Sequence, residues 1–345
     1  MTELTIREAV TVLSQKLILE EGVAGVGCRL SEPRIVVYVE DEYTARKVPS
    51  TLLGYRVETV VTGRLYALSM PPASWATGRL LSGLEIPKTT RVRPAPGGVS
   101  VGSVLVTAGT LACLVYDAET GKPLILSNRH VFWGPEGTAI VQPGPYDGGR
   151  DPYDVIGRIV RFAEIREYPD INIVDAALGE PTSPGAVSNE VLDIGVIAGV
   201  EEAKEGAVVC KSGRTTCYTC GRIADTLATV KVYGYKTMSG YAVFEDQIIV
   251  EPAIARPGDS GSIAVNPETR RAVGLVFAGS DAVTAMNKAT NVARLLGVSF
   301  TTPTPRYPAL QAALSLLAST APITVVGVTV IAATAAGKTY MPQVE

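Results

Sequence analysis

The sequence predicts a mainly β protein, preceded by a small α+β unit and followed by an apolar C-terminal tail. Between Val99 and Ser299, short Val- and Ile-rich segments alternate with clusters of Gly, Pro and Asp, which is typical of an antiparallel all-β sandwich or barrel. Residues 1–70 combine helical and strand patterns, and residues 312–337 carry no charged side chain. With 345 residues, 46% of them hydrophobic and 19% charged, the chain can bury a sizeable core, which excludes a disordered protein.

The N-terminal unit, residues 1–70, is expected to contain two helices and three strands. Apolar residues three and four apart predict helices, and Val- and Ile-rich runs bounded by turn residues predict strands. The helices are expected at residues 4–20 and 41–53, with Pro49 interrupting the second. The strands are expected at residues 23–30, 34–40 and 55–68.

Residues 71–98, rich in Pro, Gly and Arg, predict a linker before the main β domain at residues 99–303. The short apolar runs of that domain predict strands at residues 110–116, 124–127, 156–161, 208–211, 228–232, 247–250 and 272–278. A short helix is expected at residues 283–296, where it would close the domain.

The C-terminal extension, residues 304–345, leaves two structures open. The uncharged stretch at residues 312–337 is long enough to span a bilayer. Pro322 lies in its middle, however, and Ser, Thr, Ala and Gly dilute its apolar character. A packed helix followed by a buried strand at residues 323–331 is therefore favoured over a membrane anchor, although periodicity alone does not separate the two.

The charge balance excludes one class of partner. The net charge is −3, from 31 basic and 34 acidic residues, and nothing marks a nucleic-acid surface. The first residues, Met1 to Glu8, lack the basic start and apolar stretch of a secretory signal, which predicts a cytoplasmic protein. Asn and Gln, which are thermolabile, are few, and this fits a thermophilic source. Nothing in the sequence indicates the oligomeric state.

A candidate nucleophile lies in the segment Pro257-Gly-Asp-Ser-Gly261. Its glycines allow a tight turn that aims the amides of Gly258 and Ser260 at one point, where an oxyanion would form, and leaves the Ser260 hydroxyl exposed. The same residues are also good chemistry for an ordinary surface turn. Taken alone, the segment leaves both interpretations open.

The candidate general base is His130, the only histidine in the chain. It follows a predicted strand, at a position where loops commonly carry function. No other side chain type has an unperturbed pKa so close to neutrality. A mechanism that depends on histidine must therefore use His130.

The candidate orienting carboxylate is Asp175. It lies within an apolar run, where a carboxylate is costly unless it is paired. Asp170 is the rival, but it follows Pro169 and has the surroundings of a loop residue. Asp175 is favoured, because a buried carboxylate is the kind that orients a histidine.

These residues resemble trypsin-like peptidases of the chymotrypsin fold. The order His, Asp, Ser is that of the chymotrypsin-like enzymes, and the segments Ser127–His130 and Gly258–Gly261 resemble their histidine and nucleophile motifs. A narrower resemblance, to a group of prokaryotic trypsin-like peptidases, covers residues from about 20 to 300. It is carried by the segments 22–27, 93–100, 107–110, 126–131, 142–149, 174–177 and 211–216.

The resemblance implies two antiparallel β-barrels with the catalytic triad His130, Asp175 and Ser260 in the cleft between them. It implies oxyanion donors at the amides of Gly258 and Ser260. Substrate-binding residues are implied at Ile254, at the base of the primary specificity pocket, and at Phe277 and Gly279 on the lining strand. An apolar base argues against a preference for Arg or Lys.

Three features depart from the resembled pattern. Val131 follows the histidine where secreted relatives carry a half-cystine. Phe277 stands where a small hydroxyl residue is common, which puts substrate entry in doubt. No activation cleavage site with a new apolar N-terminus is evident, which leaves zymogen control open.

Three cysteines raise the alternatives of a zinc site and a disulfide: Cys210, Cys217 and Cys220. A structural zinc site usually needs four ligands, and His130 is committed elsewhere. A disulfide between two of the three is favoured, especially in a thermophile, and neither a metal nor another cofactor is expected.

The leading expectation is a serine endopeptidase that acts on peptide or protein substrates through an acyl-enzyme on Ser260. Two alternatives remain. One is a self-processing protease that acts once on its own termini. The other is a non-catalytic peptide-binding module built on a protease fold.

Overall fold

The structure is a computed structural model that describes residues 4–68, 88–235 and 237–303. The predicted extension at residues 304–345, with its possible membrane segment, lies outside the described residues, as does most of the predicted linker. Within the part of the chain that is described, no helix is long and apolar enough to cross a membrane.

The N-terminal residues form a helix packed against a small sheet. Helix α1 (Ile6–Leu17) begins with a capping box, in which the Thr5 hydroxyl accepts a hydrogen bond from the Glu8 amide and the Glu8 carboxylate accepts one from the Thr5 amide. The sheet contains β1 (Val23–Arg29), β2 (Arg34–Val39), β3 (Thr51–Leu52) and β4 (Tyr55–Val61). Strand β2 is antiparallel to β1 and parallel to β4, and the apolar side of α1 packs onto this sheet.

Two predictions for this unit are wrong in extent. The helix expected at residues 41–53 is a single turn, α2 (Glu42–Ala45), because Leu53 and Gly54 adopt positive φ angles of 47° and 86° in the hairpin between β3 and β4. The strand expected at residues 55–68 divides into β4 and β5 (Leu65–Ala67), because Gly63, with φ 71°, turns the chain between them.

Eight strands form the first large sheet. In spatial order they are β22 (Val298–Ser299), β9 (Cys113–Asp117), β10 (Pro123–Ser127), β13 (Ala177–Pro181), β12 (Val155–Phe162), β11 (Ala139–Val141), β7 (Ser100–Ser103) and β8 (Gly109–Thr110). A three-stranded sheet contains β15 (Gly195–Val196), β14 (Val187–Val191) and β6 (Ala95–Gly97), and a 3-10 turn, η2 (Pro145–Asp147), precedes β12.

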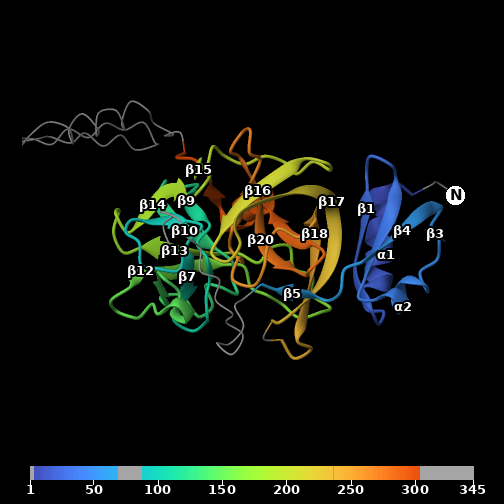
Figure 1. Ribbon diagram of the computed structural model, residues 1–345, viewed down its shortest axis with the longest axis horizontal. Helices are drawn as coiled ribbons and strands as arrows, with labels where there is room; N and C mark the ends of the chain where they lie inside the picture. Colours follow the sequence, from blue (N-terminus) through green and yellow to red (C-terminus); the bar gives the residue numbers. More distant parts are fainter. Residues whose placement is uncertain (1–3, 69–87, 236, 304–345) are drawn as a thin grey trace, which may run out of the picture. The chain divides into compact units, whose positions relative to one another are not determined.

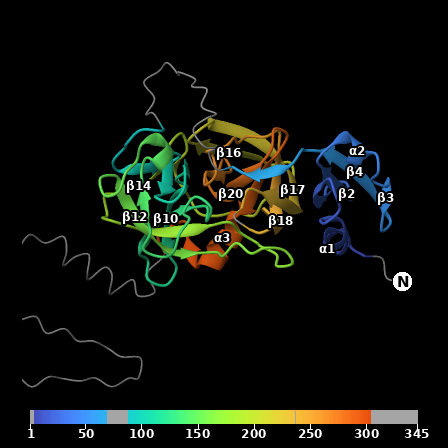
Figure 2. The same cartoon turned by 90° about the horizontal axis from the view of Figure 1, so that it is seen from below.

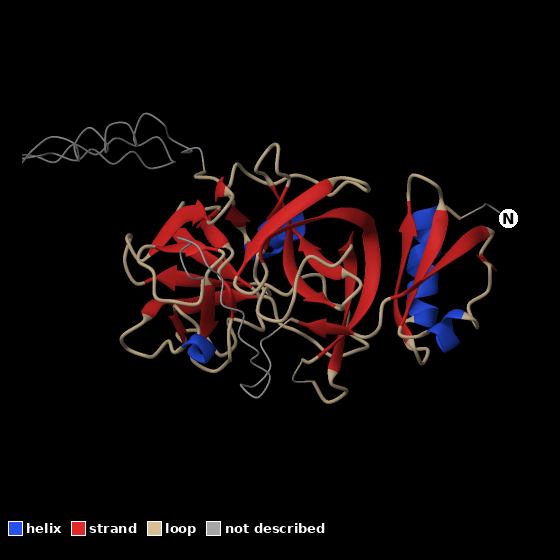
Figure 3. Ribbon diagram, in the orientation of Figure 1, coloured by secondary structure: helices blue, strands red, loops and turns tan. Residues whose placement is uncertain are grey.

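The second large sheet contains the longest strands. In spatial order they are β16 (Val208–Gly213), β19 (Ile263–Val265), β20 (Ala272–Gly279), β21 (Thr284–Lys288), β18 (Tyr241–Glu251) and β17 (Cys217–Tyr233). Because β17 also pairs with β16, the pairings of these six strands form a ring, whereas those of the first sheet form an open path among the described residues. The mainly β fold class is confirmed (Figure 3), and the architecture of two closed barrels stays a prediction.

The helix expected at residues 283–296 is correct only in its second half. Residues 284–288 form β21, which pairs with β18 on one side and β20 on the other. Helix α3 (Ala289–Leu296) follows and ends at Gly297, whose φ is 61°. Strand pairing on both edges overrides the helical spacing of the apolar residues in β21.

The N-terminal sheet continues into the second large sheet. Strand β1 pairs antiparallel with β17, with Gly25 opposite Val230, so that one sheet of eleven strands runs across both (Figure 1). Strand β5 then leaves the N-terminal sheet and pairs with β20 and β17 (Figure 2). Residues before position 69 therefore contact the β domain at two separate places.

Candidate active site

His130 lies in a tight turn that follows β10. The Asn128 carbonyl accepts hydrogen bonds from the amides of Val131 and Phe132, which closes the turn. The Arg129 guanidinium lies 3.6 Å from the centre of the Phe162 ring and donates to two backbone carbonyls in the same turn and just after it. These contacts hold the imidazole in a buried position, with 8% of the residue exposed.

Asp175 is fully buried and directly contacts His130. One carboxylate oxygen accepts a hydrogen bond from the His130 amide at 3.1 Å, and the other contacts His130 Nδ1. Asp170, the rival, is exposed and 3.7 Å from Arg166. The structure therefore brings Asp175 and not Asp170 to the histidine.

Three further side chains hold Asp175. The Tyr235 hydroxyl donates a 2.5 Å hydrogen bond to the carboxylate. The Asp175 amide donates to Asn287 Oδ1 at 3.0 Å, and its carbonyl accepts from Asn128 Nδ2 at 2.7 Å. The polar groups of the buried aspartate are thus satisfied.

The pKa of Asp175 is held below its ordinary value. Burial by itself raises this pKa. The charge of His130 and the hydrogen bonds from His130 and Tyr235 lower it by a larger amount, so the net shift is downward. Burial, together with the neighbouring Asp175 charge, raises the pKa of Tyr235 well above its usual range. Asp175 is therefore the charged partner and Tyr235 the neutral donor.

Ser260 lies in a loop with a glycine two positions before it and another directly after it, and both have φ angles that favour glycine. Gly258 and Gly261 have φ angles of 99° and 94°, and a Cβ on Gly261 would lie 2.1 Å from the Thr110 carbonyl oxygen. The Thr110 amide donates to the Ser260 carbonyl at 2.7 Å, which fixes the loop against β8. Sequence reasoning predicted this turn, and the structure contains it. The prediction that the turn leaves Ser260 exposed is wrong, because the residue is fully buried and its hydroxyl is bonded to the Phe277 carbonyl.

The Ser260 side chain does not contact the histidine in this structure. Its hydroxyl donates to the Phe277 carbonyl at 3.2 Å. His130 Nε2 is buried and has no hydrogen-bond partner among the described residues. Gly109 links the two segments, because a Cβ there would lie 2.5 Å from the Val131 side chain and 2.9 Å from the Ser260 carbonyl oxygen.

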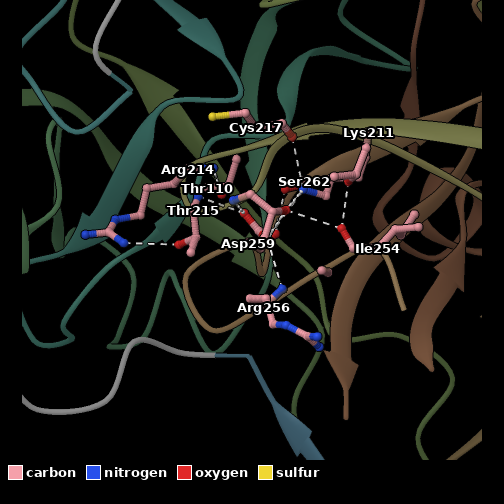
Figure 4. Close-up of polar contacts among 12 residues, drawn as sticks. Thr110, Lys211, Arg214, Thr215, Cys217, Ile254, Arg256, Asp259 and Ser262 are labelled. Carbon is pink, nitrogen blue, oxygen red and sulfur yellow. Dashed lines mark hydrogen bonds and ion pairs between the residues drawn. The ribbon is translucent and has the colours of Figure 1, made fainter. Parts of the chain in front are cut away.

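Asp259, next to the candidate nucleophile in the chain, accepts several hydrogen bonds that anchor the loop (Figure 4). Its carboxylate accepts hydrogen bonds from the amides of Arg256 at 2.9 Å and Thr215 at 2.8 Å, and from the Thr216 hydroxyl at 2.6 Å. The ammonium of Lys211, as fully buried as Asp259, lies 3.4 Å away. Burial lowers the pKa of Lys211, and the Asp259 charge opposes that shift.

The residues expected to line the specificity pocket separate into two groups. Ile254 is 4% exposed and belongs to an apolar cluster with Ala255 and Val276. The Phe277 ring lies in another cluster, 4.9 Å from the Phe244 ring, so that Phe277 offers only its backbone on the side of Ser260. The large Phe277 side chain, expected from the sequence to hinder substrate entry, packs its ring against Phe244 instead.

A segment of the chain lies against these groups. Strand β5 pairs antiparallel with the end of β20, with Tyr66 opposite Gly279. The Leu68 carbonyl accepts a 2.7 Å hydrogen bond from the Gly258 amide, one of the two predicted oxyanion donors. Among the described residues, the Ser260 amide has no hydrogen-bond acceptor.

The favoured disulfide is present between Cys210 and Cys220, which face each other on β16 and β17. Cys217 is free. A zinc site with these three cysteines is not formed, because the disulfide uses two of them.

Sequence reasoning missed Tyr235, Asn287 and Lys211. Tyr235 and Asn287 are 60 and 112 residues from Asp175 in the chain, and no local motif marks them. A signal did exist for Lys211, because it directly follows the apolar residues Val208–Cys210, and a lysine in a buried strand requires a counter-charge.

Comparison with solved structures finds proteases. A protease from Nocardiopsis shares 19% sequence identity at a TM-score of 0.43, over 59% of this chain and 96% of that chain. Thermobifida fusca protease A shares 20% at 0.44, over 60% and 98%. A Cellulomonas bogoriensis chymotrypsin shares 18% at 0.43, over 60% and 98%. No protein-family model matches the chain, and no curated protein sequence does.

These solved structures are similar to the chain in fold. The structure is mainly β, with two large curled sheets, as the sequence predicts. What this chain does chemically follows from its own residues.

Proposed function

We propose that this chain is a serine endopeptidase in which Ser260 is the nucleophile, His130 the general base and Asp175 the residue that orients His130. The observation that carries the proposal is the buried contact between Asp175 and His130 Nδ1. It fixes the tautomer, so that Nε2 is the nitrogen left to accept a proton.

The hydrolysis follows from these positions. Ser260 Oγ leaves its bond to the Phe277 carbonyl, transfers its proton to His130 Nε2 and adds to the substrate carbonyl carbon. The Gly258 and Ser260 amides donate to the developing oxyanion. His130 then protonates the leaving amine, and water hydrolyses the acyl-enzyme by the same route.

The substrate class follows from the apolar surroundings of Ile254. The side chains of Ala255, Val276 and Leu68 pack in one apolar cluster with Ile254. A cationic side chain in that position would be desolvated without a counter-charge. We therefore expect apolar residues on the acyl side of the cleaved bond.

Labelling with a fluorophosphonate tests the proposal. Wild type, Ser260→Ala and His130→Ala are incubated with the probe, and the modified peptide is identified by mass spectrometry. We expect a label on Ser260 in wild type, none in Ser260→Ala, and labelling at least about a hundredfold slower in His130→Ala. Folded wild type that stays unlabelled at neutral pH and elevated temperature, alone and with Leu68→Asp introduced to open the cleft, would overturn the proposal.

A non-catalytic peptide-binding module is the second candidate. The bond from the Ser260 hydroxyl to the Phe277 carbonyl favours it, because that bond keeps the hydroxyl from His130. A module of this kind would gain thermal stability on adding apolar peptides, would leave them uncut and would take no label. Turnover of the same peptides would exclude it.

A further inference from the structure

We propose that the chain is its own first substrate: residues 65–68 occupy the acyl side of the cleft, and Ser260 cleaves the bond between Leu68 and Ser69. This inference rests on the proposed function, since it uses the same nucleophile and base. It adds the identity of the bond, a leucine specificity and an N-terminal product that stays bound.

The backbone of β5 is aligned as a substrate strand. It runs antiparallel to β20, with Tyr66 opposite Gly279 and Ala67 opposite Ala278. The Leu68 amide continues the ladder by donating to the Phe277 carbonyl at 3.1 Å. An extended peptide that adds to a strand edge in this way is a common mode of peptide recognition.

The Leu68 carbonyl is the group presented for attack. Its oxygen accepts the 2.7 Å hydrogen bond from the Gly258 amide, within the range expected for an oxyanion donor. The Phe277 carbonyl accepts hydrogen bonds from both the Leu68 amide and the Ser260 hydroxyl. The nucleophile and the peptide unit that ends in Leu68 therefore share one hydrogen-bond acceptor.

The Leu68 side chain fills an apolar site. It is 3% exposed and belongs to the same apolar cluster as Ile254, Ala255 and Val276. A Cβ on Gly279 would lie 3.6 Å from Leu68 Cδ1, so the leucine packs against the backbone of the lining strand. Leucine thus takes the place in which an apolar acyl-side residue is expected.

The N-terminal sheet delivers the segment to the cleft. The turn at Gly63 directs the chain from β4 into β5. Arg64 forms an ion pair with Glu40 at 2.9 Å, and its guanidinium lies 5.2 Å from the centre of the Tyr233 ring on β17. Tyr66 lies with its ring 5.9 Å from the same tyrosine. These contacts hold β5 on the N-terminal side of the peptide unit that enters the site.

A cleft remains beside the segment. It has a volume of about 340 Å³ and is lined by residues 62–64, Tyr66, Leu68, residues 255–257 and residues 279–281. The cleft therefore lies between the segment, the residues that lead into the Ser260 loop and the end of β20.

The step balances without an added reactant other than water. Ser260 Oγ forms an ester with the Leu68 carbonyl carbon, and its proton passes through His130 Nε2 to the Ser69 nitrogen as the peptide bond breaks. Water then hydrolyses the ester, which gives the Leu68 carboxylate and restores Ser260. The product that ends at Leu68 keeps its pairings through β5 and β1, so it remains bound and competes with added substrate for the cleft.

Intact-mass measurement of the full chain tests the proposal. Wild type and Ser260→Ala are incubated in parallel, and the fragments are mapped. We expect wild type to give two fragments, one ending at Leu68 and one beginning at Ser69, which elute together in gel filtration. Ser260→Ala is expected to stay intact. Cleavage at another bond, or equal cleavage in both proteins, would overturn the proposal.

A peptide assay separates this inference from the proposed function. The peptide Leu-Tyr-Ala-Leu-p-nitroanilide copies residues 65–68, and its partner ends in Arg in place of the last Leu. We expect kcat/KM to be at least about tenfold higher for the Leu form. Wild type that stays intact yet hydrolyses the peptide would refute self-cleavage and leave the endopeptidase standing. Wild type that does neither, and takes no label, would refute both.

Two variants test the fit of Leu68. Leu68→Asp should slow self-cleavage about tenfold or more, because a carboxylate does not enter the apolar site, and it should raise hydrolysis of the added peptide. Leu19→Asp, which changes an exposed leucine, is the matched control and should behave as wild type. Equal self-cleavage by the two variants, with both folded by circular dichroism, would contradict the assignment.

Discussion

At the residue scale, the histidine–aspartate pair depends on a tyrosine that no sequence motif marks. The Tyr235 hydroxyl is the only side chain besides His130 that donates to the Asp175 carboxylate among the described residues. A hydrogen bond to a buried charge contributes more than a neutral one. Tyr235 is therefore a positioning residue that acts through Asp175.

Tyr235→Phe should lower kcat/KM about tenfold, since a hydrogen bond to a charged group is worth about 1.5–3 kcal/mol. It removes one of the hydrogen bonds that lower the pKa of Asp175, so this pKa rises. A carboxylate with a higher pKa takes up its proton at higher pH, and the acid limb of kcat/KM should move to higher pH. Hydrolysis of the leucyl peptide between pH 4 and 9 measures both effects.

Tyr153→Phe is the control for that substitution, because Tyr153 is 79% exposed. Its pH profile should superimpose on that of wild type. A Tyr235→Phe profile that does the same would show that the hydroxyl contributes nothing to the pair.

At the element scale, the loop that carries Ser260 is held by a buried charge on the neighbouring strand β16. Lys211 and Asp259 are both fully buried and form an ion pair, and among the described residues the Asp259 carboxylate also accepts four hydrogen bonds, from three amides and the Thr216 hydroxyl. The positive charge that balances Asp259 is the ammonium of Lys211. The loop therefore does not depend on a new N-terminal ammonium, created by cleavage, as its counter-charge.

Lys211→Met should lower the free energy of unfolding by about 3–5 kcal/mol, because Asp259 stays buried without its counter-charge. Adding Asp259→Asn should recover part of the loss. Urea unfolding in the Ser260→Ala background, in which the chain is expected to stay intact, measures both. Arg166→Met, which breaks an exposed pair, should change stability by less than about 1 kcal/mol. Equal losses for Lys211→Met and Arg166→Met would contradict the account.

The disulfide between β16 and β17 should stabilise the same region. Cys210 and Cys220 are separated by 10 residues, and closing a loop of this length contributes about 3 kcal/mol in the chain-entropy model. Replacing both by Ser should lower the urea midpoint accordingly. Cys217→Ser, at the free cysteine of the same hairpin, is the control. Identical midpoints for the two variants would mean that the disulfide adds no stability.

Strands and turns were predictable where the pattern is local. The two strands at the start of the chain and the glycine turn around Ser260 follow from β-branched residues and from positions that need positive φ. The long strand β17 was seen only in part, since Asp225 and the register shifts beside it break the apolar alternation. Strand β5 looked like the end of β4, because its partner β20 lies about two hundred residues away in the chain.

In the candidate site, too, features that depend on local sequence were predictable, and features that depend on distant strand pairing were not. His130, Asp175 and Ser260 were proposed from residue type, order and expected burial, and the structure brings the first two into contact. The presence of Leu68 in the cleft was not predictable in this detail, because it depends on pairing between distant strands. Self-processing was an alternative from the sequence, but no bond was named.

At the scale of the whole molecule, the N-terminal sheet is joined to the β domain around one buried carboxylate. Asp225 on β17 accepts hydrogen bonds from the Cys28 amide at 2.9 Å and the Tyr38 hydroxyl at 3.0 Å, both across the seam between β1 and β17. A Cβ on Gly27 would lie 1.8 Å from the carboxylate, so the close approach requires glycine. Burial raises the pKa of Asp225 to about 6, and the hydrogen bonds oppose this rise.

This raised pKa predicts that the chain loses stability as the pH rises from about 4 to 6. In that interval the folded protein holds a proton on Asp225 that the unfolded chain has released, so each step up in pH favours unfolding. A shift of about two pKa units corresponds to about 3 kcal/mol.

Urea unfolding of Ser260→Ala between pH 4 and 7, with and without Asp225→Asn, should show this slope only when Asp225 is present. The Asp225→Asn variant should be less stable at every pH, because its side-chain amide replaces an oxygen that accepts hydrogen bonds. Its free energy of unfolding should not fall between pH 4 and 6. Asp170→Asn, at an exposed aspartate, should keep the slope. Parallel pH profiles for Asp225→Asn and its parent would show that Asp225 does not bind the proton, and the seam would then be insensitive to pH in this range.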